Sequence, residues 1–157
     1  MIRRAIREYR KAVPKLRRLT PGEWRDMLSA QLALLIAQLR VWTLAQGRLT
    51  TPSGDPAPPV SPSVAEIPKA RNLALAVSRA ATFGVFRPAC LVRSVALCRL
   101  MERRGIHHGI VRVGVVMRGG RFHAHAWVEY AGEVLGDDPL SVSDYETLPG
   151  VNVLHAD

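Results

Sequence analysis

The chain has 157 residues, of which 48% are hydrophobic and 22% charged, and it contains two cysteines. This length allows one domain that buries its own core without disulfide bonds. Two cysteines without a C-x-x-C pair exclude a disulfide framework and the common structural zinc motifs. The most apolar run, residues 28–39, is interrupted by Gln31 and Gln38, so it is too short and too polar to span a bilayer. No secretory signal is recognisable, and we expect a cytoplasmic protein with reduced thiols.

The net charge of +9 is unevenly distributed along the chain. Residues 1–18 contain eight Lys and Arg against one Glu, whereas residues 129–157 contain seven acidic residues and no Lys or Arg. Apolar residues of the basic segment recur at the spacing of one helix face: Ile2, Ile6, Tyr9 and Val13. We therefore expect a helix with a solvated basic face. No zinc-finger, RNA-binding or helix-turn-helix pattern accompanies it, so nucleic-acid binding is not expected.

Two helices are predicted in the first half of the chain. Residues 20–23, Thr-Pro-Gly-Glu, have the pattern of a capping box, with Thr as N-cap and Glu at the third helical position. The helix that begins there is expected to run to about Gln46 and to end at Gly47. A second helix, rich in Ala, Leu and Val, is predicted from about 68 to 83.

A stretch rich in proline separates these two helices. Residues 47–63 contain five prolines and two glycines, which indicates a linker or a surface loop. We therefore expect an N-terminal basic helical region over 1–46 and a second region over 64–157, packed together as one compact domain.

Cys90 is predicted to begin a third helix. The preceding Pro88 disfavours a helical conformation for Arg87 and suits the start of a helix after it. The string LVRSVALCRLMERR is helical in composition, and Gly105 ends it. Unpaired N–H groups and the positive end of the helix dipole would stabilise a thiolate at Cys90. Cys98, two turns deeper, is expected to be buried and to act as a small hydrophobic residue.

After this helix the hydrophobic pattern changes to that of strands. The predicted elements are a strand over 110–117, a turn over 118–121 and a strand over 122–130. Alternation places His125 and Trp127 on the same face of the second strand. Ala131 and Gly132 then turn the chain toward Asp137 and Asp138. We expect an α+β fold in which N-terminal helices lead to a nucleophile helix packed on a small antiparallel sheet.

The order cysteine, histidine, carboxylate is the order in which papain-like and transglutaminase-like sites are assembled. In such sites the thiolate attacks an acyl carbon, the imidazole transfers protons, and the carboxylate fixes the imidazole tautomer. The third residue depends on the turn at 131–132. A two-residue turn would place Asp138 directly opposite His125, whereas a three-residue turn would bring Asp137 to the same face on a diagonal.

The strings RPACLVRSVALCRLMERRG and GIVRVGVVMRGGRFHAHAWVEYAGEVLGDD, with the helix before them, resemble the leader peptidases of lasso-peptide biosynthesis. These are the bacterial, transglutaminase-like B proteins, and the likeness covers residues 65–140. The resemblance implies that Cys90 is the nucleophile, His125 the general base and then acid, and Asp137 the orienting carboxylate. It implies hydrolysis of the bond between leader and core of a ribosomally made precursor peptide.

The resemblance also implies partners. It suits the stand-alone peptidase form, in which a separate small protein recognises the leader and an asparagine-synthetase-like lasso cyclase acts next. No metal or organic cofactor is expected for this chemistry. Three alternatives are left open: acyl transfer to an amine, a non-catalytic peptide-binding scaffold of the same fold, and a zinc site at His123, His125 and Cys90. The zinc site lacks a fourth ligand in the sequence.

Overall fold

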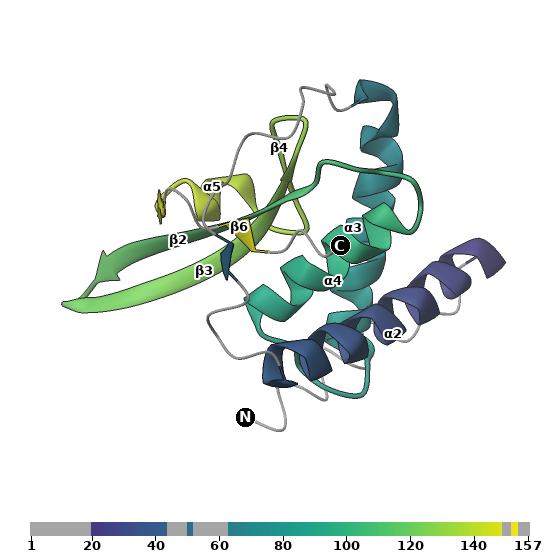
Figure 1. The fold of residues 1–157 in the computed structure, drawn as a ribbon, viewed down its shortest axis with the longest axis horizontal. Coiled ribbons are helices and arrows are strands. Elements are labelled where there is room, and N and C mark those ends of the chain that lie inside the picture. The colour runs from purple at the N-terminus through teal and green to yellow at the C-terminus, as the bar shows by residue number, and fades with distance from the viewer. Residues whose placement is uncertain (1–19, 44–49, 52–62, 149–151, 154–157) are drawn as a thin grey trace.

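The structure is a computed structural model that describes residues 20–43, 50–51, 63–148 and 152–153. The predicted basic helix at 1–18 and most of the predicted loop at 47–63 lie outside the described residues. The helices are α2 (Pro21–Thr43), α3 (Ile67–Phe83), α4 (Cys90–Glu102) and the short α5 (Pro139–Val142). The strands are β1 (Thr50–Thr51), β2 (Ile110–Arg118), β3 (Arg121–Tyr130), β4 (Glu133–Leu135), β5 (Glu146–Thr147) and β6 (Asn152–Val153). Figure 1 shows α2, α3 and α4 gathered beside the sheet, so the predicted α+β class is confirmed.

The capping box at the start of α2 forms as predicted. The backbone N–H of Thr20 donates to Glu23 Oε2 at 2.9 Å, and the N–H of Glu23 donates to Thr20 Oγ1 at 3.3 Å. Glu23 also accepts a hydrogen bond of 3.0 Å from Arg79 Nη1 on α3, which joins the two helices. These contacts lower the pKa of Glu23, chiefly through the hydrogen bond from the Thr20 backbone.

Helix α4 lies at the centre of the fold. It packs on α2, on α3 and on β3. Its buried side chains are Val92, Ser94, Val95, Ala96, Leu97, Cys98, Leu100 and Met101. Because most of its surface is covered, the helix holds its first residue, Cys90, in a fixed position relative to the sheet.

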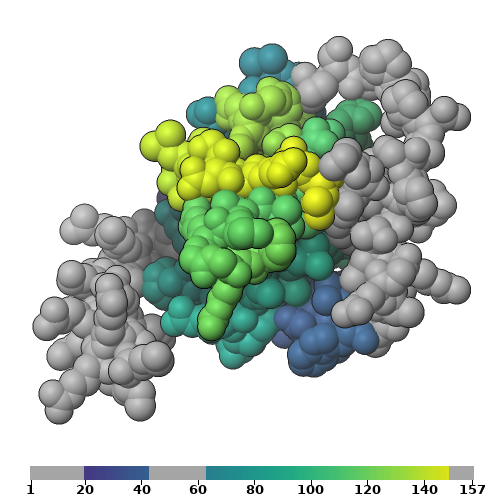
Figure 2. Space-filling model, turned by 90° about the vertical axis from the view of Figure 1, so that its left-hand side faces the viewer, coloured from purple at the N-terminus to yellow at the C-terminus, as the bar shows by residue number. Residues whose placement is uncertain are grey.

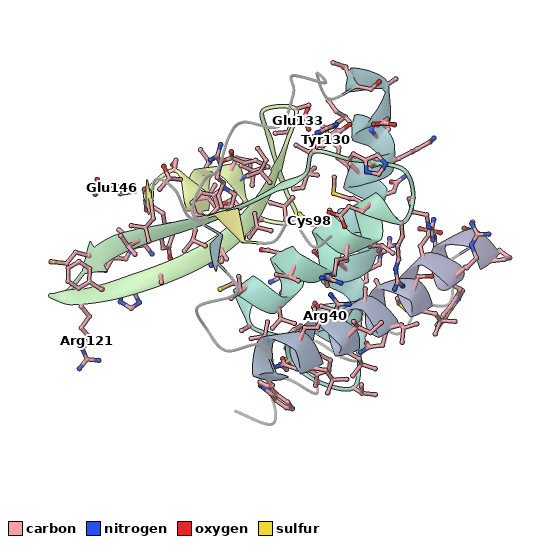
Figure 3. The ribbon with its side chains drawn as sticks, in the orientation of Figure 1. Arg40, Cys98, Arg121, Tyr130, Glu133 and Glu146 are labelled. Carbon is pink, nitrogen blue, oxygen red and sulfur yellow. The ribbon has the colours of Figure 1, made fainter. Side chains whose placement is uncertain are left out.

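The main sheet has four antiparallel strands in the order β4-β3-β2-β5. A turn was predicted over 118–121, and Gly119 and Gly120, with φ of 57° and 73°, form a two-residue turn there between β2 and β3. Figure 1 shows this hairpin projecting beyond the helices, and Figure 3 shows Arg121 pointing away from its tip. Val128 and Tyr130 belong to the core shared with the helices.

The turn between β3 and β4 corrects one geometric expectation. Tyr130 pairs with Glu133, so the turn has two residues, Ala131 and Gly132, with φ of 51° and 79°. The three-residue turn that would bring Asp137 to the face of His125 therefore does not form. Strand β4 stops at Leu135, and Gly136 takes a φ of 76°. The strand register therefore ends before the two aspartates, and the chain path after Gly136 decides where each of them lies.

The segment after β4 contains elements that were not predicted. Helix α5 begins at Pro139, and β5 adds a fourth strand beside β2 through the pair Gly114–Thr147. Figure 2 shows this segment, in yellow, lying along the green β2–β3 hairpin. It brings Tyr145 to the same part of the sheet as His125. Across the described ranges, no helix combines the length and apolar character that crossing a membrane requires.

Candidate active site

Cys90 is the first residue of α4. Its N-cap residue, Ala89, has an extended backbone and no side chain that can cap the helix. The first backbone hydrogen bond of the helix is donated by the Arg93 N–H to the Ala89 carbonyl oxygen, at 3.1 Å. The N–H groups of residues 90–92 therefore have no partner within the helix, and they carry its positive partial charge. This end of α4 suits a thiolate or a developing oxyanion.

The second cysteine differs in its surroundings. Cys98 is 8% exposed and lies in the core between the helices and the sheet (Figure 3). Burial, with a smaller contribution from Glu102, raises the pKa of Cys98 to about 12. The predicted burial of Cys98 is confirmed, and its thiol is suited to packing rather than to nucleophilic attack.

His125 and Asp137 form a direct hydrogen bond. The distance from His125 Nε2 to Asp137 Oδ2 is 2.6 Å, and the two side chains are 24% and 26% exposed. A carboxylate can only accept, so the proton lies on Nε2 and leaves Nδ1 of a neutral imidazole as the acceptor. The structure thus brings Asp137, reached by the turn at Gly136, to the histidine.

The neighbouring aspartate has a different set of contacts. Asp138 is the N-cap of α5, where its carboxylate accepts from the Leu140 N–H at 3.3 Å and from Ser141 Oγ at 2.8 Å. Its own N–H donates to Asp137 Oδ1 at 3.0 Å. The two consecutive aspartates therefore act in different places, one at the imidazole and one at a helix start.

Cys90 and Asp137 border the same small cavity. It has a volume of about 20 Å³ and lies between α3, α4, β3 and the end of β4. Asp137 also borders a surface cleft of about 370 Å³ that contains His125. Among the described residues, no hydrogen bond joins Cys90 Sγ to the imidazole. Nucleophile–base contacts often tighten only when substrate is bound.

Arg93 connects the helix of Cys90 to the chain that carries Asp137. Its Nη2 donates to the carbonyl oxygen of Gly136 at 3.2 Å. Ser94 Oγ donates to the Cys90 carbonyl at 3.1 Å. The sequence alone assigned no role to Arg93, although it lies within the string RPACLVRSVALCRLMERRG that carries the resemblance.

Two aromatic rings pack beside the imidazole and against each other. The Trp127 ring stacks with that of His125 at a centroid distance of 6.3 Å, and the Tyr145 ring lies at 5.4 Å. Trp127 is only 3% exposed, and its Nε1 donates to Glu129 Oε1 at 3.0 Å. Tyr145 was missed by sequence reasoning because its segment has no helical or strand periodicity.

The metal alternative gains no support from the geometry. His123 is exposed on the outer part of β3. In the part of the chain that the structure describes, no group of three or more His, Cys, Asp or Glu side chains could hold a metal ion.

Comparison with known proteins identifies the family. A family model described as the transglutaminase-like superfamily matches residues 32–149, a range that includes Cys90, His125 and Asp137. Comparisons with curated proteins and with solved structures gave no significant match. The superfamily includes cysteine peptidases and acyltransferases and generally comprises cysteine-dependent enzymes. The match covers well over half of the chain, which therefore belongs to the transglutaminase-like superfamily.

Proposed function

We propose that this protein is a cysteine peptidase that removes the leader from a lasso-peptide precursor. Cys90 is the nucleophile, His125 the general base and then acid, and Asp137 the orienting carboxylate. The observation that carries the chemistry is the 2.6 Å bond between His125 and Asp137. Asp137 borders the same small cavity as Cys90, the first residue of α4. The choice of substrate rests on the resemblance of the strings around Cys90 and His125 to lasso leader peptidases.

The reaction follows from these three side chains. His125 Nδ1 takes the Cys90 proton, and the thiolate attacks the carbonyl carbon of the leader–core peptide bond. The imidazolium gives that proton to the leaving nitrogen, the C–N bond breaks, and the leader is held as a thioester while the core departs as an amine. Water then attacks the thioester, and His125 passes a proton from the water back to the sulfur. Asp137 stabilises the imidazolium formed in each half.

Two further features support a peptide substrate. The Cys90 N–H, at the start of α4, is a natural donor to the oxyanion of the tetrahedral intermediate. Surface clefts of about 370 and about 380 Å³ each include Asp137 in their walls. An extended peptide can use such clefts on the two sides of its scissile bond. The leader-recognition protein and the lasso cyclase are proposed as partners on the resemblance alone.

Mass spectrometry of a co-encoded precursor tests this function. The protein is incubated with the precursor, with and without the leader-binding protein, and with a primary amine in a parallel sample. We expect two fragments whose masses sum to the precursor plus one water, formed faster when the leader-binding protein is present.

Matched cysteine variants serve as controls. Cys90→Ala should abolish cleavage, and Cys98→Ala should retain it. A product carrying the added amine would instead identify an acyltransferase. Precursor left intact by the wild-type protein with the leader-binding protein present, or cleaved equally by Cys90→Ala, would refute the peptidase.

A further inference from the structure

Tyr145 contacts the proposed catalytic histidine from a separate part of the chain. The ring centroids of Tyr145 and His125 are 5.4 Å apart, and their planes make an angle of 39°. Trp127 completes the group, with its ring 6.3 Å from each of the other two. We propose that Tyr145 is a positioning residue that fixes the orientation of the His125 imidazole. This inference rests on the proposed function.

Space for the Tyr145 ring exists because a glycine lies opposite the histidine. Gly114 on β2 pairs directly with His125 on β3. A Cβ at this position would lie 2.8 Å from Trp127 Cη2 and 2.9 Å from Tyr145 Cβ. Both distances are shorter than real Cβ contacts, so any side chain here would displace the two rings. Glycine is thus required by the close approach of the aromatic side chains to the backbone of β2.

Tyr145 is itself held in place from two directions. Its N–H donates to the Val142 carbonyl at 3.0 Å, at the end of α5. The guanidinium of Arg118 lies over its ring, 5.6 Å from the centroid, and Arg118 also pairs with Asp144 at 2.7 Å. The ring is therefore tied both to α5 and to the β2–β3 hairpin.

A single hydrogen bond does not define the orientation of an imidazole. The bond from Nε2 to Asp137 fixes one nitrogen, but the ring plane can still rotate about that bond. The Tyr145 and Trp127 rings, which pack against one side of the imidazole and against each other, restrict this rotation, so that Nδ1 keeps one direction in which to accept the thiol proton. Tyr145 also lines the cleft that contains His125 and Asp137, where it limits the access of water to their bond. A charge-assisted hydrogen bond is stronger where water is excluded.

Kinetics of three variants test the role of Tyr145. Tyr145→Leu removes the ring, and a misdirected base should lower kcat by about 10- to 100-fold with little change in KM. Tyr145→Phe keeps the ring and should rescue kcat to within about twofold of wild type. Gly114→Ala, which displaces the same rings, should reproduce the loss seen for Tyr145→Leu. Phe122→Leu, an aromatic replacement at a 74% exposed position of β3, is the matched control and should leave kcat unchanged.

Nitrogen-15 NMR of the imidazole gives a readout that does not depend on activity. Wild type and Tyr145→Phe should show His125 as a single tautomer protonated on Nε2. In Tyr145→Leu and Gly114→Ala, water that reaches the bond to Asp137 should compete with it, so that the Nδ1 tautomer appears as well. Folding is checked by thermal unfolding of each variant. A wild-type kcat and a single tautomer in Tyr145→Leu would overturn the positioning role.

The NMR result also separates the two proposals. If wild type cleaves no precursor, the peptidase proposal fails, but the tautomer populations still decide whether Tyr145 orients His125. A second outcome is that wild type cleaves the precursor but the kcat of Tyr145→Phe is as low as that of Tyr145→Leu. The hydroxyl group of Tyr145, and not its ring, would then be responsible. This outcome refutes the positioning role and leaves the peptidase proposal intact.

Discussion

Arg93 Nη2 on α4 donates a hydrogen bond of 3.2 Å to the carbonyl oxygen of Gly136. One partner lies one turn after Cys90, and the other lies one residue before Asp137. The bond therefore couples the position of α4, which begins at Cys90, to that of the carboxylate that holds His125. A glycine with a φ of 76° gives the chain the conformation in which this carbonyl faces α4.

The first prediction concerns this bond. Arg93→Met should lower the turnover of precursor about tenfold, because the loop carrying Asp137 loses its tie to α4 and shifts relative to Cys90. The cost in stability should be about 1 kcal/mol, because Arg93 Nε is buried with no hydrogen-bond partner among the described residues, and its removal offsets part of the lost bond. Arg99→Met, at a second partly buried arginine of the same helix, is the control and should keep the wild-type rate. Equal rates for Arg93→Met and wild type would contradict the coupling.

The second prediction separates the two cysteines. An alkylating reagent at neutral pH should modify Cys90 first, because burial raises the pKa of Cys98 to about 12 and keeps its thiol protonated and covered. Peptide mapping of the alkylated protein measures the order. Faster modification of Cys98 would rule out Cys90 as the nucleophile. Cys90→Ala should remove cleavage and preserve the far-UV circular dichroism spectrum.

The third prediction separates the two aspartates. Asp137→Asn should lower turnover in part, since a carboxamide can accept a hydrogen bond but stabilises the imidazolium less, and Asp137→Ala should lower it further. Asp138→Ala should change turnover little and cost about 1 kcal/mol of stability, because it removes the N-cap of α5. Initial rates and urea unfolding of the three variants check this. The assignment of Asp137 fails if Asp138→Ala is the most impaired enzyme.

The fourth prediction concerns stability at alkaline pH. Burial and the hydrogen bond to Glu66 raise the pKa of Tyr130 from 10.0 to about 12, and burial raises the pKa of Cys98 from 9.0 to about 12. The folded state thus keeps protons that the unfolded chain loses, so the free energy of unfolding should decrease as the pH rises from about 9 toward 12. Urea unfolding across this range measures the slope. Cys98→Ala should reduce the slope from pH 9 upward, and an unchanged slope would contradict the shift for Cys98.

Local sequence rules accounted for much of the fold. The capping box at Thr20 and Glu23, the turn at Gly119 and Gly120, and the helix that begins at Cys90 all form as predicted. Each depends on contacts within a few residues, whose preferences are present in the sequence itself.

The contacts of His125 depended on segments that are distant in the chain. Register alone favoured Asp138 once the turn had two residues, yet Asp137 bonds His125 because β4 ends at Leu135 and the chain turns at Gly136. No local pattern encodes the end of that strand.

The sequence by itself determined the class of fold, the position of Cys90 at a helix start, and the face of the strand that carries His125. Only the tertiary structure decided which aspartate meets the imidazole and that Tyr145 covers it. The physical reason is that these two contacts need the packing of α4, β2 and α5 around the site. The Arg93–Gly136 bond and the space above Gly114 exist only after those elements have come together.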